Sequence, residues 1–346
     1  MWIRESRAMA LAAIAYAALA AGCASVPASL PVAPGTASRA AQASEHAALA
    51  GGIPSAMLPG VAARLRPTGR RGPTGPLRAS RDVNSCQYYG NDCATYASAE
   101  NVLTYSSTLT KGLVNPQGTV TDGKGNWYIA NTGRSNVLVL HAKEQQTTAL
   151  SDAGQYPVAV SVENSARLVA VSNIYTTSYA SGSVALYAGG SVTPTSTLHV
   201  ADFVEGVGIA IDPSGNCFWS YNDATLGDGV LVEFRDCAGK ARTVVSGLGY
   251  AGGVAFDKHG NLYYTDQITG VYRCAGTRSC GLLSTGYGDP LMINFDAPSK
   301  VLWVADATGY LDAVDPQTGT ILVSNPAVGG ASDPPFGVAP DAGPRS

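Results

Sequence analysis

Short runs of alternating apolar and polar residues, separated by clusters of glycine, aspartate, asparagine and proline, fill the chain beyond residue 92. This alternation predicts half-buried β-strands joined by tight turns. Three of the runs align without a gap, at residues 118–128, 208–218 and 253–263, and each has aspartate four residues after a glycine and Gly-Asn three residues later. Self-similarity with a period near 45 residues is typical of propellers and solenoids.

The first glycine of each run serves as an anchor for locating the other strands. Matching positions lie at Gly118, Ala159, Gly208, Gly253, Met292 and Gly337, at intervals of 41, 49, 45, 39 and 45 residues. These anchors predict six inner strands and therefore six blades. Residues of high β-propensity predict second strands over 127–130, 168–172, 217–221, 262–265 and 301–305, and third strands over 137–140, 184–187, 230–234 and 271–273.

The two ends of the repeat region complement each other. The sixth inner strand, near residues 335–340, has no room for partner strands before Ser346. Residues 93–106 have the pattern of second and third strands without a first. We therefore expect the C-terminal strand to complete the N-terminal blade, which would close the ring and leave no large sheet edge exposed.

The repeated pattern Pro-x-Gly-x-x-x-Asp-x-x-Gly-Asn-x-Tyr-x-x-Asn/Asp, followed by Asn-x-Val-x-Val, resembles that of NHL-type six-bladed propellers and of their relatives, the regucalcin-like gluconolactonases. The resemblance covers about residues 92–340 and implies an all-β six-bladed propeller. Its matching residues are turn residues. Gly-Asn suits a hairpin turn with positive φ, Asp122, Asp212 and Asp257 suit Asx caps, and Asn131, Asp266 and Asp306 are expected to act similarly where second strands end.

The gluconolactonase resemblance also implies a divalent cation at the N-terminal mouth of the inner strands, held by Glu, Asn and Asp side chains that often directly precede the anchor. The corresponding residues here are Gln117, Val158, Val207, Gly252, Leu291 and Phe336. A divalent cation without a carboxylate ligand would be held poorly. This departure favours a binding or scaffold module over a hydrolase.

A more polar ring lies two positions further out. It consists of Asn115, Tyr156, Glu205, Tyr250, Asp289 and Pro334, with Asp333 beside it. With Gln117, these side chains form a candidate ligand site at the channel mouth, suited to a cation or a sugar. The alternative is a solvated acidic rim without a specific ligand. Glu205, Asp289 and Asn115 are the candidate metal ligands, and calcium is the cation that such oxygen ligands suit; no other cofactor is predicted.

The N-terminus has the features of an export signal. Arg4 and Arg7 precede an apolar run over residues 8–21, which is too short to span a bilayer. Ala20-Ala21-Gly22-Cys23 resembles a bacterial lipobox. The resemblance implies cleavage before Cys23 and acylation of its thiol, and Ala24 implies the outer membrane of a Gram-negative bacterium. An ordinary signal peptide, with Cys23 as a bystander, is the alternative.

A segment rich in alanine, proline and arginine separates this signal from the repeats. Residues 1–81 carry nine Lys/Arg and two Asp/Glu, whereas residues 82–346 carry thirteen and twenty-three. Six arginines lie between residues 64 and 81, where they would attract anionic head groups or simply solubilise a linker. The acidic remainder of an exported chain argues against binding nucleic acid.

Six cysteines remain after Cys23, an even number that predicts disulfides in an exported protein. Local pairing joins Cys86 to Cys93, Cys217 to Cys237 and Cys274 to Cys280, because each pair brackets a turn or hairpin. Zinc binding is the alternative, but zinc sites favour clusters with two to four residues between cysteines. These pairs enclose six, nineteen and five residues.

Three parts are therefore predicted: a lipoprotein signal over residues 1–22, a lipidated tether over 23–81 and the propeller over 82–346. The preferred hypothesis is a membrane-anchored, non-catalytic module that binds an envelope protein or glycan. The alternatives are a metal-dependent hydrolase of the gluconolactonase type and a purely structural stalk and head.

Overall fold

A computed structural model describes the backbone of residues 84–89, 92–99 and 102–109, and residues 112–340 apart from 142–146, 164, 166, 224–226, 297–298 and 327–334. Side chains are described from residue 112 onward. The chain separates into two units, Met1–Arg39 and Ala40–Ser346. All described residues belong to the second unit. The proposed signal and Cys23 lie outside the described residues.

Five antiparallel sheets, each of four consecutive strands, form five blades. The first contains β4 (Pro116–Thr121), β5 (Trp127–Asn131), β6 (Asn136–Leu140) and β7 (Thr147–Ser151). The second contains β8 (Gln155–Val162), β9 (Leu168–Thr176), β10 (Ser183–Ala188) and β11 (Ser196–Leu198). The third contains β12 (Val204–Ile211), β13 (Cys217–Asp223), β14 (Gly229–Phe234) and β15 (Arg242–Leu248). The fourth contains β16 (Ala251–Phe256), β17 (Leu262–Asp266), β18 (Gly270–Ala275) and β19 (Arg278–Ser284). The fifth contains β20 (Pro290–Phe295), β21 (Leu302–Asp306), β22 (Tyr310–Val314) and β23 (Ile321–Pro326).

The predicted count of six blades is thereby corrected to five blades of consecutive strands. The remaining sheet joins the two ends of the repeat region, because β24 (Val338–Pro340) pairs with β1 (Asn84–Tyr89), which continues through β2 (Asp92–Ala99) to β3 (Val102–Leu109). Ser85 is opposite Pro340 in this antiparallel pair, and Gln87 is opposite Val338. The N-terminal segment supplies three strands to the sheet, not the two that were predicted.

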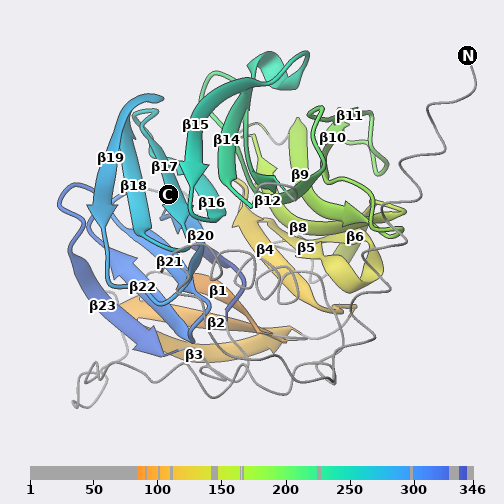
Figure 1. Cartoon of the computed structure of the whole chain (residues 1–346). Coiled ribbons are helices and arrows are strands. Elements are labelled where there is room, and N and C mark those ends of the chain that lie inside the picture. Colours follow the sequence, from red (N-terminus) through yellow and green to blue (C-terminus); the bar gives the residue numbers. More distant parts are fainter. Residues whose placement is uncertain are drawn as a thin grey trace, which may run out of the picture. The chain divides into compact units, whose positions relative to one another are not determined.

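The sheets succeed one another around a centre in Figure 1, from orange β1–β3 through yellow and green to blue β20–β23. The first strand of each blade is the inner one, and β24 occupies the equivalent place between β20 and β4. All these inner strands run in the same direction through the ring. We call the end at which they begin the N-face and the end at which they finish the C-face.

The anchor residues lie where neighbouring inner strands approach most closely. A Cβ atom placed on Gly253 would lie 2.9 Å from the Cα atom of Met292, and one on Gly208 would lie 2.9 Å from the Cα atom of Gly253. The same distance separates a Cβ atom on Gly337 from the Cα atom of Gly118. Glycine at these positions is therefore a condition for closing the ring of inner strands.

Side-chain hydroxyl groups tie three pairs of neighbouring blades together. Ser220 donates to the carbonyl oxygen of Gly252 at 2.5 Å, and Thr265 donates to that of Leu291 at 3.3 Å. The Thr132 hydroxyl, in the 3₁₀ turn η3 (Thr132–Arg134), donates to Pro157 at 2.5 Å. These bonds satisfy inner-strand carbonyl groups that the ladder within one blade leaves available.

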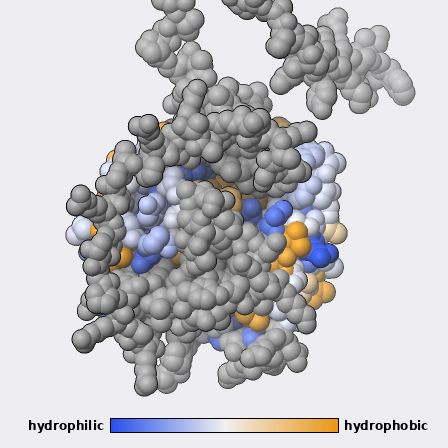
Figure 2. All heavy atoms as spheres, turned by 90° about the horizontal axis from the view of Figure 1, so that it is seen from below, coloured by the Kyte–Doolittle hydropathy of each residue, from blue (hydrophilic) through white to orange (hydrophobic). Residues whose placement is uncertain are grey.

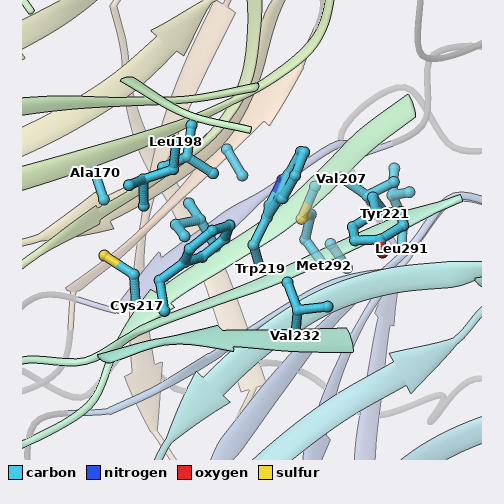
Figure 3. Packing of buried hydrophobic residues seen from close by; sticks show 14 of the residues in the cluster. Ala170, Leu198, Val207, Cys217, Trp219, Tyr221, Val232, Leu291 and Met292 are labelled. Atoms are coloured by element: carbon cyan, nitrogen blue, oxygen red, sulfur yellow. The ribbon is translucent and has the colours of Figure 1, made fainter. Parts of the chain in front are cut away.

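The largest apolar cluster crosses the ring from the second and third blades to the fifth. It contains the fully buried Trp219, with Val207 of β12 and Leu291 and Met292 of β20. Figure 3 shows Val207, Leu291 and Met292 gathered beside Trp219. Inner strands that are not neighbours in the ring therefore share one core.

Two of the three predicted disulfides are confirmed, Cys217–Cys237 and Cys274–Cys280. Cys237 ends the 3₁₀ turn η4 (Arg235–Cys237), which follows β14. The side chains of Cys86 and Cys93 lie outside the described residues. Disulfides persist in oxidising compartments, and the confirmed pairs indicate an extracytoplasmic protein.

Hydrophobic residues in the described part of the surface form small separate groups on the side shown in Figure 2. Among the residues that the structure describes, no helix is long and apolar enough to cross a membrane.

Candidate functional site

The residues that directly precede the anchors close the channel towards the N-face. Val158, Val207 and Leu291 are buried, and Phe336 packs against the cluster that contains Val207 and Leu291. Gln117 is also buried, on β4. The ring that the gluconolactonase resemblance assigns to metal ligands is thus mainly an apolar plug.

The outer ring is only partly assembled into one site. Glu205, Tyr250 and Asp289 are buried, Tyr156 is half-buried and Asn115 is exposed. Asn115, Glu205 and Asp289 are carried by or directly precede β4, β12 and β20, which are alternate inner strands. Asp333 lies outside the described residues. In the described part of the chain, no group of three or more His, Cys, Asp or Glu side chains is placed to hold a metal ion.

Two tyrosine hydroxyl groups hold the carboxylate of Glu205. Tyr250 donates to Oε2 at 2.6 Å, and Tyr175, on β9, donates to Oε1. Burial is the main cause that raises the pKa of both phenols, and the neighbouring Glu205 raises it further. Both phenols therefore stay protonated as donors, and Glu205, which is 7% exposed, joins the second, third and fourth blades.

Four aromatic rings form a cluster beside this carboxylate, which we call the aromatic cluster: Tyr156, Tyr175, Tyr179 and Phe203. Tyr179 lies 6.1 Å from Tyr156 and 6.4 Å from Tyr175, measured between ring centroids. Phe203 stacks on Tyr175 at 6.0 Å. Tyr179 is 59% exposed and Phe203 is 45% exposed, so the cluster presents a large aromatic surface to solvent.

Hydrogen bonds between connections hold the aromatic cluster in place. The Thr177 amide donates to Gly154 at 2.8 Å, which fixes the turn of Tyr179 against the segment before Tyr156. The Ser181 hydroxyl donates to the carbonyl oxygen of Asp202 at 3.2 Å and accepts from the Val204 amide at 3.1 Å. Phe203 therefore lies between two anchored residues, and the cluster is organised before any ligand binds.

The sequence prediction missed Tyr175, Tyr179 and Phe203. It used only the positions one and three residues before each anchor, whereas these residues lie at the end of β9 and in the β9–β10 and β11–β12 connections. The available signal was aromatic residues within a Ser-, Thr- and Gly-rich connection at 175–182, which a turn alone does not require.

The described charges are distributed unequally between the two faces. The N-face carries one arginine and eight carboxylates, namely Arg134 and Asp152, Asp202, Glu205, Asp223, Asp228, Asp266, Asp289 and Asp306. The half nearer the C-face carries eight carboxylates, namely Asp122, Glu163, Asp212, Glu233, Asp236, Asp257, Asp296 and Asp315. It also carries nine bases, namely Lys124, Arg167, Arg235, Lys240, Arg242, Lys258, Arg273, Arg278 and Lys300. Five of the eight N-face carboxylates are buried, and Asp202, Asp223 and Asp228 are at least partly exposed. The aromatic cluster therefore lies on the more acidic face.

The C-face turns repeat the arrangement predicted from sequence. Asp257 Oδ1 accepts the amides of His259 at 2.8 Å and Asn261 at 2.9 Å, while Oδ2 accepts the side-chain amide of Asn261 at 2.8 Å. Asp122 and Asp212 make the same three bonds in their turns. The three turn glycines have φ values of 82°, 87° and 78°. The predicted Asx caps and positive φ angles are confirmed.

A central cavity of about 450 Å³ is lined by the C-face halves of the inner strands. Its carboxylates already bind the protein. Asp212 and Asp257 cap turns, Glu163 accepts the Ser165 hydroxyl at 2.8 Å, and Asp296 accepts the amides of Lys300 and Val301. Burial is the main cause that raises the pKa of Asp296. Each of these four carboxylates thus accepts a hydrogen bond from a residue close to it in sequence.

The comparisons with known proteins concern the fold. Neither a protein-family model nor a curated protein sequence matches the chain. A chain in the crystal structure of a nidogen/laminin complex is similar, with a TM-score of 0.62 and 14% identity over 75% of this chain and 98% of that one. Regucalcin, a calcium-binding protein from Agrobacterium tumefaciens, has a TM-score of 0.49 and 16% identity over 61% of this chain and 74% of its own. The similarity to the nidogen/laminin chain, together with the sheets described above, identifies this protein as an all-β propeller.

Proposed function

We propose that this protein is an exported, lipid-anchored binding module of the cell envelope that holds a partner on its N-face without catalysing a reaction. The aromatic cluster carries this proposal, because two large, exposed aromatic rings are fixed by neighbouring connections on the more acidic face. Exposed aromatic residues of this kind mark binding surfaces. The nidogen/laminin structure supports it only as an example of a similar fold within a protein complex.

The domain boundaries remain part of the proposal, with a signal over residues 1–22, a tether lipidated at Cys23 over 23–81 and the propeller over 82–346. The sheet formed by β24 and β1–β3 acts as a sixth blade that closes the ring. The hydrolase alternative has less support, because Val207 and Leu291 occupy the ring where metal ligands would be needed.

The Cys23→Ser variant tests the anchor, since it is expected to leave the membrane fraction; retention there would contradict lipid anchoring.

Site-specific photo-crosslinking in intact cells tests the binding face. A photoreactive residue replaces Ile268, which is 50% exposed on the N-face and lies outside the aromatic cluster. The matched control replaces Leu322, which is 43% exposed at the C-face end of β23. A discrete crosslinked partner is expected from position 268 and not from position 322. The proposal fails if neither position, or only the control, yields a partner.

A further inference from the structure

The acidity of the N-face and its aromatic cluster together restrict the chemistry of a ligand. Asp202, Asp223 and Asp228 are at least partly exposed on this face, and Arg134 is its only lysine or arginine among the described residues, with His199 beside it as an exposed imidazole. The charges of Asp202 and Asp223, after burial, raise the pKa of Tyr221, which places both carboxylates near this phenol. A cationic ligand would gain from this field, whereas an anionic ligand would be repelled.

The bonding of the tyrosines distinguishes a cation from a sugar. Glu205 already accepts the hydroxyl groups of Tyr175 and Tyr250, so these polar groups are committed to the protein. Tyr179 is 59% exposed and Phe203 is 45% exposed, so both rings are accessible to a ligand. The face of an aromatic ring carries negative charge and attracts guanidinium and ammonium groups. Sugar recognition would in addition need hydroxyl-bonding partners around the rings.

We propose that the aromatic cluster binds arginine side chains, and that the partner is therefore a protein with an exposed arginine-rich segment. The planar guanidinium group stacks on aromatic rings and stays charged, which suits it better than ammonium to the faces of Tyr179 and Phe203. Flanking carboxylates hold the other basic side chains of the same segment. This inference rests on the proposed binding function and specifies the chemistry of its partner.

The chain's own tether supplies a competitor for this site. Six arginines lie between residues 64 and 81, and they would bind the same surface in the same molecule. The binding assay therefore uses the full chain with these six arginines changed to glutamine. Its probe is a fluorescent tetra-arginine peptide, with a tetra-glutamine peptide as the uncharged control.

Substitutions at Phe203 separate the aromatic character of this residue from its apolar surface. We expect Phe203→Leu to weaken tetra-arginine binding at least about fivefold, because a cation–π contact contributes roughly 1 kcal/mol. Phe203→Tyr keeps the ring and should keep the affinity. Leu322→Ala, at a position 43% exposed on the outer strand β23, is the matched control and should change nothing.

A salt titration and a neutral ligand test whether the binding depends on charge. Tetra-arginine binding should weaken when salt rises from about 0.05 M to about 0.5 M, because the carboxylates are then screened. The arginine assignment would be overturned if the Phe203→Leu variant bound tetra-arginine as tightly as the parent does. Preference of the parent for a neutral oligosaccharide over the peptide would overturn it as well. If position 268 still captures a partner in cells while tetra-arginine fails to bind, the arginine chemistry is wrong and the proposed binding function stands.

Discussion

The two faces of the propeller are built by different rules. On the C-face, the same Asp, Gly and Asn make the same three hydrogen bonds in three turns, and all the partners lie within four residues of the aspartate. On the N-face, Asp266 and Asp306 also repeat a cap, because each accepts two amides from the segment that precedes the inner strand of its blade. Other N-face contacts join residues from different blades, such as Glu205 and Tyr250. The C-face caps are thus made of local bonds alone, whereas the N-face adds bonds between blades.

Charge follows the same division. The C-face half has nearly balanced charge, and the carboxylates around its cavity bind turn amides. The N-face has a large excess of carboxylates, together with the exposed aromatic cluster. A face that only has to fold can repeat one local solution, whereas a face that binds a partner needs unlike groups at defined positions. The comparison can be tested through stability and binding.

The largest expected effect is a loss of stability of the whole propeller, which would affect both faces. Gly253→Ala places a Cβ atom 2.7 Å from the Ile293 amide nitrogen, so that backbone atoms must move. We expect a loss of about 3 kcal/mol in the free energy of unfolding, measured by urea denaturation. Gly281→Ala, where a Cβ atom meets nothing within 4 Å, should stay within about 0.5 kcal/mol. Equal losses at the two positions would refute close approach of the inner strands as the cause.

A second effect is specific to the N-face. Asp152, in the β7–β8 connection, is 1% exposed, and burial is the main cause that raises its pKa from 3.8 to about 6. Between these pH values the folded state keeps a proton that the unfolded state releases. The contribution of this group to the free energy of unfolding therefore falls as pH rises and is least favourable above pH 6.

The Asp152→Asn variant tests this sign directly. It should be more stable than the parent at pH 7, by up to about 3 kcal/mol, and close to it near pH 4. The measurement is the difference between the two proteins in urea denaturation across this range, which cancels the titration of all other groups. A variant that is less stable than the parent at pH 7 would show that the carboxylate has a favourable partner in the folded protein.

A matched pair of neutral substitutions compares the faces directly. Glu205→Gln removes one of two oxygen acceptors from a pair of tyrosine donors and should cost about 1.5 kcal/mol. Asp257→Asn retains the oxygen that accepts two backbone amides, loses only the acceptor of the Asn261 side-chain amide, and should cost less than about 1 kcal/mol. Thermal unfolding of both variants at one pH measures the difference. A larger loss of stability from Asp257→Asn than from Glu205→Gln would show that bonds between blades on the N-face do not contribute more than local bonds on the C-face.

The smallest effect is expected from an ion pair of the C-face half whose arginine is exposed and whose glutamate, Glu233, is largely buried. Arg242 binds Glu233 through its Nε atom at 2.9 Å, and the arginine side chain is 56% exposed. Because solvent screens such pairs, Arg242→Gln should change the free energy of unfolding by less than about 1 kcal/mol. The effect should shrink further in high salt. A loss that salt does not reduce would indicate a packing role for the arginine stem.

The sequence predicted those parts of the molecule that depend on local rules. The anchors, the capped turns and two disulfides follow from spacings within a few residues or within one hairpin. The blade count was corrected because the sequence prediction counted the sheet shared by the two ends of the chain as a sixth blade. Asn131, Asp266 and Asp306 were correctly placed at strand ends; for example, Asp266 accepts the amides of Gly249 and Tyr250.

The site was predicted only in part, for a physical reason. Glu205 and Tyr250 were placed in one ring by counting from the anchors, and they do meet. Tyr179 and Phe203 cannot be placed in this way, because they lie in connections whose positions depend on bonds such as Thr177 to Gly154 and Ser181 to Asp202. Asn115 and Asp289 also lie three residues before an anchor, but they belong to the first and fifth blades and not to those that carry Glu205 and Tyr250.

The pairing that closes the ring also has a mechanical consequence. β1 enters its sheet at the C-face, with Ser85 opposite Pro340, and is bonded on its other side to β2 from Asn84 to Tyr89. If Cys23 anchors the chain, any pull between membrane and partner reaches the propeller at Asn84 and acts along this strand. The hydrogen bonds on both sides of β1 then share the load in shear and need not break one after another. The strand that pairs with the ring-closing β24 would thus let the molecule bear force at the point where its tether ends.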